Sequence, residues 1–104
     1  MRMLDIGVGG GRTTRFLAPQ VKEYFAIDYS SRLIEECRIK FKEVIKEENF
    51  ITGDARSLSR IFPGKKFDFI LFSFNGIDCM NYEERNDLLM EIKLLLNPSG
   101  YFCF

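Results

Sequence analysis

A run of glycines near the amino terminus, Gly7-Val8-Gly9-Gly10-Gly11, is the part of the chain best suited to contact a ligand through bare backbone. Glycine weakens a regular helix or strand by roughly 0.5–1 kcal/mol relative to alanine, so this run predicts a loop. Backbone without side chains lets a ligand approach closely. A helix that follows such a loop also offers unpaired N–H groups at its start.

The spacing of these glycines differs from two common nucleotide-binding motifs. The dinucleotide motif GxGxxG fails in both registers, because Arg12 or Thr14 stands where its last glycine should be when the count begins at Gly7 or Gly9. The Gly-Lys-Ser/Thr of a Walker phosphate loop is also absent. The chain instead reads Asp-x-Gly-x-Gly-x-Gly from Asp5 onward. The missing last glycine argues against a NAD-type dinucleotide-binding domain. That domain and a tight turn without any ligand are the two alternatives to a binding loop of another kind.

Two aspartates follow later apolar runs. Asp28 closes Phe25-Ala26-Ile27-Asp28, and Asp54 follows Ile51-Thr52-Gly53. A carboxylate at the end of a strand can accept two hydrogen bonds from a ribose diol, and it would repel a phosphorylated ribose. The alternatives are structural: Asp28 as a helix N-cap and Asp54 in an Asx turn.

The elements that must position these groups alternate along the chain. Apolar runs predict strands at Met3–Ile6, Tyr24–Ile27, Phe50–Ile51, Phe67–Phe72 and Tyr101–Phe104. Helices are predicted from Gly11 to Leu17, from Ser31 to Lys46, from Ser57 to Ile61 and from Tyr82 to Leu96. Ser30 or Ser31 is suited to cap the second helix, and Asn81 with Glu84 forms a capping box for the last.

This alternation predicts an α/β fold, a doubly wound parallel sheet with helices on both faces. Ligands of such sheets bind at the carboxyl ends of the strands. The loops that follow Ile6, Ile27, Thr52 and Phe72 are therefore the ones that we expect to form a site.

The segment DIGVGGG resembles motif I of class I S-adenosylmethionine-dependent methyltransferases, Rossmann-like enzymes. The resemblance implies that S-adenosylmethionine is the cofactor and that its methionine part packs on the loop containing Asp5, Gly7, Gly9 and Gly11. It also implies that Asp28 binds the ribose and that Tyr29 lies against the adenine.

The later loops extend the resemblance. Gly53-Asp54-Ala55 is similar to the family's adenine loop, in which the acid, here Asp54, accepts from the adenine amino group and Ala55 leaves room for the base. The loop after Phe72 implies cofactor contacts at Ser73 and Phe74 and substrate contacts at Asn75 and Asp78. Asn97-Pro98-Ser99-Gly100 resembles the family's turn before the fifth strand, with Asn97 and Ser99 departing from its pattern. No catalytic residue is identified.

The resemblance covers residues 1–104 as one domain and implies a strand order of 3-2-1-4-5. The family's sheet has seven strands, so we expect an incomplete core, truncated at both ends. An exposed apolar fifth strand would then favour a homo-oligomer. A non-catalytic relic of the fold, acting as an oligomerisation module, is the remaining alternative.

The amino-acid composition limits the classes of molecule that the chain is expected to bind. Lys+Arg and Asp+Glu both number 15, and the zero net charge makes nucleic acid an unlikely partner and a small molecule the expected methyl acceptor. There is no histidine and no metal-binding pattern. No apolar run approaches the ~20 residues of a membrane helix. We expect Cys37, Cys79 and Cys103 to be reduced thiols in a cytoplasmic protein.

Overall fold

A computed structural model describes residues 1–72 and 81–103. The strands are β1 (Arg2–Ile6), β2 (Glu23–Asp28), β3 (Phe50–Thr52), β4 (Phe67–Phe72) and β5 (Leu96–Cys103). The helices are α1 (Thr14–Leu17), α2 (Ser31–Lys40), α3 (Leu58–Ile61) and α4 (Tyr82–Leu95), with short 3-10 turns at Ala18–Gln20, Glu47–Asn49 and Ala55–Ser57.

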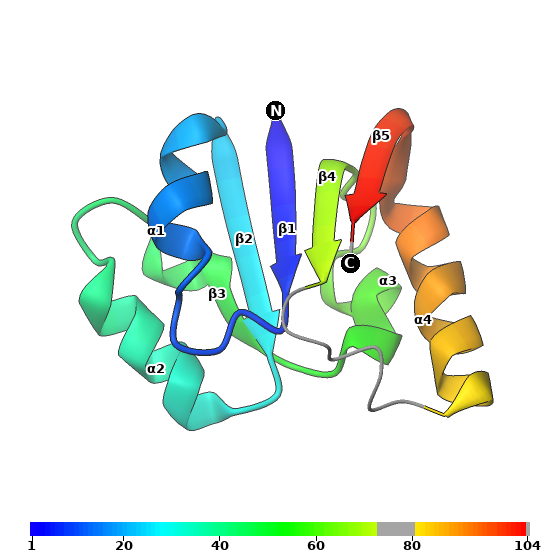
Figure 1. The fold of residues 1–104 in the computed structure, drawn as a ribbon, viewed down its shortest axis with the longest axis horizontal. Coiled ribbons are helices and arrows are strands. Elements are labelled where there is room, and N and C mark those ends of the chain that lie inside the picture. Colours follow the sequence, from blue (N-terminus) through cyan, green and yellow to red (C-terminus); the bar gives the residue numbers. More distant parts are fainter. Residues whose placement is uncertain (73–80, 104) are drawn as a thin grey trace.

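The five strands form one parallel sheet in the order β3-β2-β1-β4-β5, which confirms the predicted topology. Figure 1 shows α1 and α2 over one face, beside β2 and β3, and α3 and α4 over the other. The chain leaves β1 at the end of the sheet where the other parallel strands also finish. The loops that follow β1, β2 and β3 therefore meet at one edge, where ligands of such sheets bind.

Alternating side chains of the strands fill two cores. Leu4 and Ile6 of β1 face α3 and α4, and pack in a cluster with Phe67, Ile70 and Leu88. The opposite cluster, under α1 and α2, contains these buried residues: Met3, Val8, Tyr24, Ala26, Ile34, Cys37, Ile45 and Phe50. A sheet buried on both faces explains why its central strands read as nearly continuous apolar runs.

Both predicted helix caps are confirmed. The Ser30 hydroxyl accepts a hydrogen bond from the Leu33 N–H at 3.3 Å, which satisfies an unpaired donor at the start of α2. The Asn81 side chain accepts from the Glu84 N–H at 2.8 Å, and the Glu84 carboxylate accepts from the Asn81 N–H at 3.1 Å. This reciprocal capping box fixes the first residue of α4 and thereby the direction in which that helix leaves the strand edge.

Several predicted boundaries are wrong, and the first helix, for example, begins only at Thr14. The second helix ends at Lys40 instead of Lys46, and Val44 is exposed although its spacing had suggested the buried stripe. The helix ends because Phe41 leaves helical geometry and its ring stacks on Phe50, with centroids 6.1 Å apart. The last strand begins at Leu96, because Leu96 already pairs with Phe67 before a bulge in the ladder.

Candidate functional site

The glycine loop between β1 and α1 adopts backbone conformations that other residues rarely take. Gly7, Gly9 and Gly11 have φ values of 72°, 57° and 86°. At Gly11 a side chain would also collide with the core, because a Cβ would lie 2.6 Å from Cε2 of Phe41. Gly10 has neither constraint, since its φ lies outside the left-handed region and nothing stands within 4 Å of a Cβ there. The fold itself therefore accounts for three of the four glycines.

The end of β2 holds this loop in place. The Gly7 N–H donates to the Ile27 carbonyl at 2.8 Å, and the Gly9 N–H donates to Oδ2 of Asp28 at 3.0 Å. The other oxygen of Asp28 accepts from the Ser30 N–H at 2.9 Å. The Asp28 carboxylate therefore faces the glycine loop. An ionised carboxylate has about four acceptor sites, so these two bonds leave capacity for a ligand's hydroxyl groups.

Helix α2 binds the same loop from the outside. The Cys37 thiol donates to the Gly9 carbonyl at 3.4 Å, and the Lys40 ammonium donates to the Gly10 carbonyl at 3.0 Å. Burial raises the pKa of the Cys37 thiol, which keeps it protonated and able to donate. Acceptors on β2 and donors on α2 thus fix a segment that has almost no side chains of its own.

Asp5 lies beneath the loop and is completely buried. Its Oδ2 accepts hydrogen bonds from the Thr13 hydroxyl at 2.5 Å and from the Tyr24 hydroxyl at 2.6 Å. Thr13 immediately precedes α1, so the Asp5 carboxylate ties the residue before that helix to the carboxyl-terminal end of β1. In this structure Asp5 supports the loop from below.

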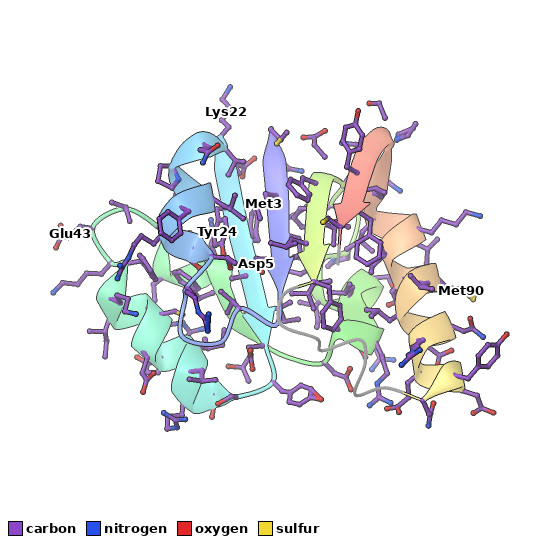
Figure 2. All side chains as sticks on the ribbon, viewed as in Figure 1. Met3, Asp5, Lys22, Tyr24, Glu43 and Met90 are labelled. Atoms are coloured by element: carbon purple, nitrogen blue, oxygen red, sulfur yellow. The ribbon has the colours of Figure 1, made fainter. Side chains whose placement is uncertain are left out.

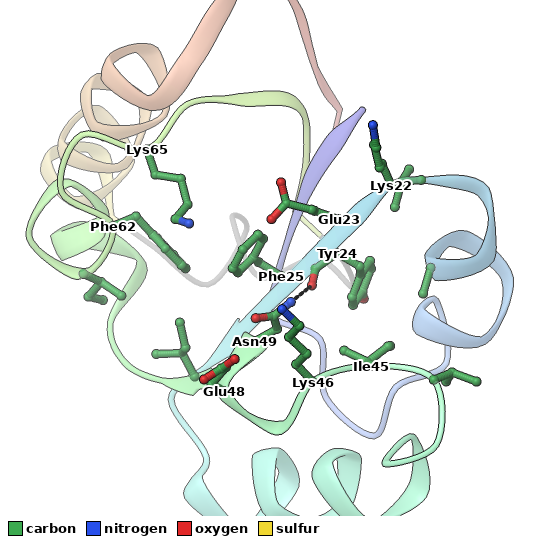
Figure 3. A pocket seen from close by; sticks show the side chains of 15 residues that line it. Lys22, Glu23, Tyr24, Phe25, Ile45, Lys46, Glu48, Asn49, Phe62 and Lys65 are labelled. Carbon is green, nitrogen blue, oxygen red and sulfur yellow. Dashed lines mark hydrogen bonds between the residues drawn. The ribbon is translucent and has the colours of Figure 1, made fainter.

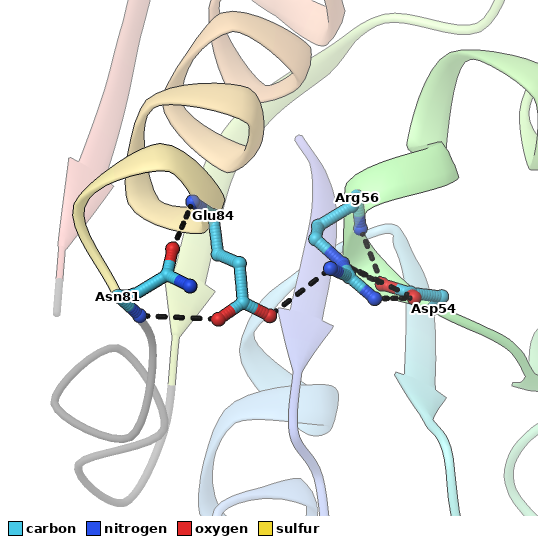
Figure 4. Close-up of polar contacts among 4 residues, drawn as sticks. All are labelled: Asp54, Arg56, Asn81 and Glu84. Carbon is cyan, nitrogen blue, oxygen red and sulfur yellow. Dashed lines mark hydrogen bonds and ion pairs between the residues drawn. The ribbon is translucent and has the colours of Figure 1, made fainter.

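Asp54, after β3, is held in the Asx turn that the sequence left open as an alternative. Its Oδ1 accepts from the Arg56 N–H at 2.8 Å, and its carboxylate also binds the Arg56 guanidinium, with Nη2 to Oδ2 at 2.7 Å. These hydrogen bonds from Arg56 hold the pKa of Asp54 below its ordinary value. The guanidinium continues to Glu84 at 3.0 Å, as Figure 4 shows, so Arg56 connects the loop after β3 to the capping box of α4.

The remaining predicted residues differ in how the structure places them. Tyr29 directly follows Asp28 and is 71% exposed, so its ring is available to a planar ligand. Ala55 is buried in the 3-10 turn beside Asp54. Ser73, Phe74, Asn75 and Asp78 lie outside the described residues.

Among the described residues, one pocket adjoins the glycine loop and another lies beside β2, and neither is lined by Asp28 or Asp54. One of about 450 Å³ adjoins the outer side of the glycine loop and is lined by Gly9, Gly10, Gly11, Arg12, Arg15, Phe16 and Lys40. The other, of about 620 Å³, lies beside the amino-terminal half of β2 and is shown in Figure 3. The Asn49 amide donates there to the Tyr24 carbonyl at 3.1 Å, in place of the strand neighbour that the short β3 does not supply. The second pocket is thus at the amino end of β2, away from the loop edge.

Sequence reasoning missed the residues that support the site. Tyr24 was predicted only as a strand residue, although its position four residues before Asp28 places both on one face of β2. Cys37 was assigned to the buried stripe of α2, and no role was predicted for Lys40 or Arg56. Period-two spacing could have found Tyr24. No sequence signal shows that Arg56 reaches Glu84, because 28 residues separate them.

Two classes of feature are not found in the described part of the chain. Within residues 1–72 and 81–103, no group of three or more histidine, cysteine, aspartate or glutamate side chains could hold a metal ion. None of the helices described there combines the length and the apolar character required to cross a lipid bilayer. Cys37 is a buried free thiol and Cys103 an exposed one.

A doubly wound sheet in this strand order, with a glycine loop after β1 and an acid closing β2, defines a Rossmann-like domain of the class I methyltransferase type. A family model described as a methyltransferase domain matches residues 3–100, so the chain belongs to that family.

Individual relatives agree with this family. A probable S-adenosylmethionine-dependent methyltransferase of Saccharomyces cerevisiae is 31% identical over 104 residues, which cover 98% of this chain and 34% of the relative. An S-adenosylmethionine-dependent methyltransferase structure from Clostridium acetobutylicum superposes with a TM-score of 0.87 at 23% identity, covering 97% of this chain and 40% of its own. The amino pentose methyltransferase CalS10 of Micromonospora echinaspora, solved with S-adenosylmethionine bound, gives a TM-score of 0.82 at 20% identity, with the same coverage. The chain therefore spans between a third and a half of the length of these proteins.

Proposed function

We propose that this chain binds S-adenosylmethionine and forms the cofactor-binding part of a methyltransferase. The observation that carries the proposal is the Asp28 carboxylate, which closes β2 and faces the glycine loop through its bond to Gly9. An acid in that position suits a ribose diol better than a phosphate. Membership of the methyltransferase domain family supports the same cofactor, as does the fold shared with the ligand-bound CalS10.

Each site residue has a proposed contact. Asp28 accepts from the two ribose hydroxyls with its remaining lone pairs, and the exposed ring of Tyr29 covers the adenine. The backbone of Gly7, Gly9 and Gly11 contacts the methionine part, while Asp5 supports that loop from below. Ser73 and Phe74 complete the cofactor contacts, on the basis of the resemblance alone.

At the adenine end of the proposed site, the Arg56 guanidinium already binds the carboxylate that we expect to contact the base. We propose that Asp54 accepts from the adenine amino group beside Ala55, although its carboxylate also binds the Arg56 guanidinium. That ion pair is exposed, with about 40% of each side chain accessible, so it is weak enough for the carboxylate to share its oxygens. Arg56 thus orients Asp54 for the base and keeps it ionised.

Methyl transfer from S-adenosylmethionine does not require a general acid or base where the nucleophile is already deprotonated. A bound S-adenosylmethionine supplies a methyl group on a positively charged sulfur that a nucleophile can attack directly. The residues of this chain contribute by holding the cofactor in one orientation on a rigid loop, and such positioning can supply roughly 7–11 kcal/mol of a barrier. A chain without histidine is consistent with this mode of catalysis.

We propose a small molecule as the methyl acceptor, contacted by Asn75 and Asp78. The zero net charge supports a partner other than nucleic acid. CalS10, which shares the fold, is named for an amino pentose substrate. Free cysteines at positions 37 and 103 support a reducing, cytoplasmic setting.

We also propose that two copies associate through β5. Among the described strands β5 is an outermost one, and Tyr101 on it is 73% exposed. An apolar outer strand is a template for pairing with another chain. Sedimentation velocity at rising concentration should show dimers for the wild type, and Tyr101→Lys should shift the boundary to monomers. A wild type that sediments as a monomer at all concentrations contradicts this part of the proposal.

A thermal-shift titration with S-adenosylhomocysteine tests the function. Ligand at 100 times its dissociation constant should add about 2.7 kcal/mol of stability and raise the melting temperature. NAD, as a comparator, should give no shift. A shift with NAD alone would support the dinucleotide-binding alternative. No shift with either ligand would leave only an unused fold acting as an oligomerisation module.

A further inference from the structure

We infer that Tyr24 is a positioning residue for the cofactor loop: its hydroxyl, through Asp5 and Thr14, holds the glycine turn in its binding conformation. This inference rests on the proposed function, because it concerns the same loop. It adds to that function a buried residue of β2 that acts on the loop through Asp5 and Thr14. Figure 2 shows Tyr24 and Asp5 together between the sheet and α1.

The hydrogen bonds around Tyr24 have a defined direction. The Tyr24 hydroxyl donates its single proton to Oδ2 of Asp5 at 2.6 Å. It must therefore accept from the Thr14 hydroxyl, which lies 2.7 Å away. Thr13 donates to the same Asp5 oxygen at 2.5 Å. Thr14 thus donates to Tyr24, and both Tyr24 and Thr13 donate to Asp5. These hydrogen bonds connect β2 and β1 to the two residues at the start of α1.

Burial makes this network costly to disturb. Asp5 and Thr14 are each 0% exposed and Tyr24 only 4%, so water cannot replace a lost partner. A buried carboxylate that loses a donor keeps the full cost of its desolvation. Burial, with the Asp5 charge as the next cause, raises the pKa of Tyr24 and keeps its hydroxyl protonated and able to donate.

The position of Tyr24 on β2 explains why it acts on the loop. Tyr24 and Asp28 lie four residues apart on one face of the strand. Asp28 holds Gly9 in the middle of the loop. Tyr24 bonds Thr14 directly at the end of the loop, and it reaches Thr13 only through the oxygen of Asp5 to which both hydroxyls donate. A single rigid strand thus fixes the loop at two points, and loss of either point frees the backbone between them.

The experiment compares Tyr24→Phe with the wild type. Phenylalanine keeps the ring that packs edge-on against Phe50, with centroids 6.5 Å apart, and removes only the hydroxyl. Amide hydrogen exchange should speed up about ten-fold or more at Gly9 and Gly11, whose N–H groups donate to Asp28 and to the Val8 carbonyl, with β4 unchanged. Calorimetric titration should show S-adenosylhomocysteine binding about ten-fold more weakly.

Two further variants separate positioning from general destabilisation. Ile92→Val trims the opposite core and lowers stability, and it should leave both loop exchange and affinity at wild-type values. Thr14→Val keeps the shape of the side chain and removes the hydroxyl that donates to Tyr24, so it should speed loop exchange as Tyr24→Phe does, and it replaces Tyr24→Phe if that variant fails to fold.

The outcomes are distinct. Unchanged loop exchange in Tyr24→Phe, or in Thr14→Val if the first variant does not fold, overturns the inference about Tyr24. A wild type that does not bind S-adenosylhomocysteine overturns the proposed function instead, while the exchange data still decide whether Tyr24 positions the loop.

Discussion

Asp28, the last residue of β2, accepts a hydrogen bond from the backbone N–H of Gly9 at 3.0 Å, so the acid and the glycine loop form one unit. The two residues are brought together because β1 and β2 are parallel neighbours whose carboxyl ends meet. A loop held in this way loses little further freedom when a ligand binds, which favours affinity. The same bond directs the carboxylate toward the surface on which we propose that the cofactor lies.

Two adjacent glycines should respond differently to alanine. Gly11→Ala forces a side chain into a left-handed backbone at φ 86° and against the Phe41 ring. We expect a loss of about 1–3 kcal/mol in the free energy of unfolding. Gly10→Ala meets neither obstacle and should leave stability unchanged or raise it by about 0.5 kcal/mol. Urea unfolding of both variants checks this, and equal stabilities would show that the turn is not constrained at Gly11.

The ion pair between Arg56 and Asp54 should be visible in a titration of the carboxyl. Replacement of Arg56 by glutamine removes the hydrogen bonds that lower the pKa of Asp54, so NMR titration should show that pKa returning toward its ordinary value. Because the folded-state pKa is depressed, the contribution of Asp54 to stability is present above its unfolded pKa of about 4 and is lost as pH falls through the folded value. The difference in stability between Arg56→Gln and the wild type should therefore shrink at low pH.

A matched control for this titration lies on α2. Arg32 forms an exposed pair with Glu36 at 2.9 Å, and Arg32→Gln should leave the Asp54 titration unchanged. An Asp54 pKa that is the same in Arg56→Gln as in the wild type contradicts the assigned cause.

The strands and both helix caps could be predicted because they depend on local pattern, whereas the strand order was implied by the resemblance to class I methyltransferases. Apolar runs give the strands, and Asn81 with Glu84 carries a capping signature at fixed spacing. The end of α2 could not be predicted, because the helical periodicity continues past Lys40 while tertiary stacking of Phe41 on Phe50 ends the helix. Propensity is a weak guide wherever such packing decides.

The acids and glycines of the candidate site could be predicted from the sequence, but the residues that support them could not. Asp28 and Asp54 follow strands and so attract attention in the sequence. Arg56 and Lys40 act through side chains that cross to distant segments, and only the fold shows where they reach. The hydrogen bond from Tyr24 to Asp5 joins two strands and is equally invisible before their register is known.

Tyr24 should contribute to the loss of stability at alkaline pH. Its pKa is raised in the folded state, mainly by burial, so its contribution is complete below the unfolded pKa of about 10 and is lost as pH rises above that value. Unfolding monitored between pH 9 and roughly 11 should show a steeper decline for the wild type than for Tyr24→Phe. Absorbance should show Tyr24, one of four tyrosines, ionising only when the protein unfolds. Ionisation of all four in the folded protein contradicts this account.

The central claim is that the Asp28 carboxylate binds the ribose of the cofactor, and calorimetric titration of Asp28→Asn with S-adenosylhomocysteine tests it most directly. The exposed Asp87, on α4, gives a matched control in Asp87→Asn. Loss of a charged acceptor should weaken binding about ten- to a hundred-fold, with the control at wild-type affinity. A 2′-deoxyribose analogue should bind the wild type more weakly and Asp28→Asn without further loss. Asp28→Asn that binds S-adenosylhomocysteine as tightly as the wild type would contradict the claim.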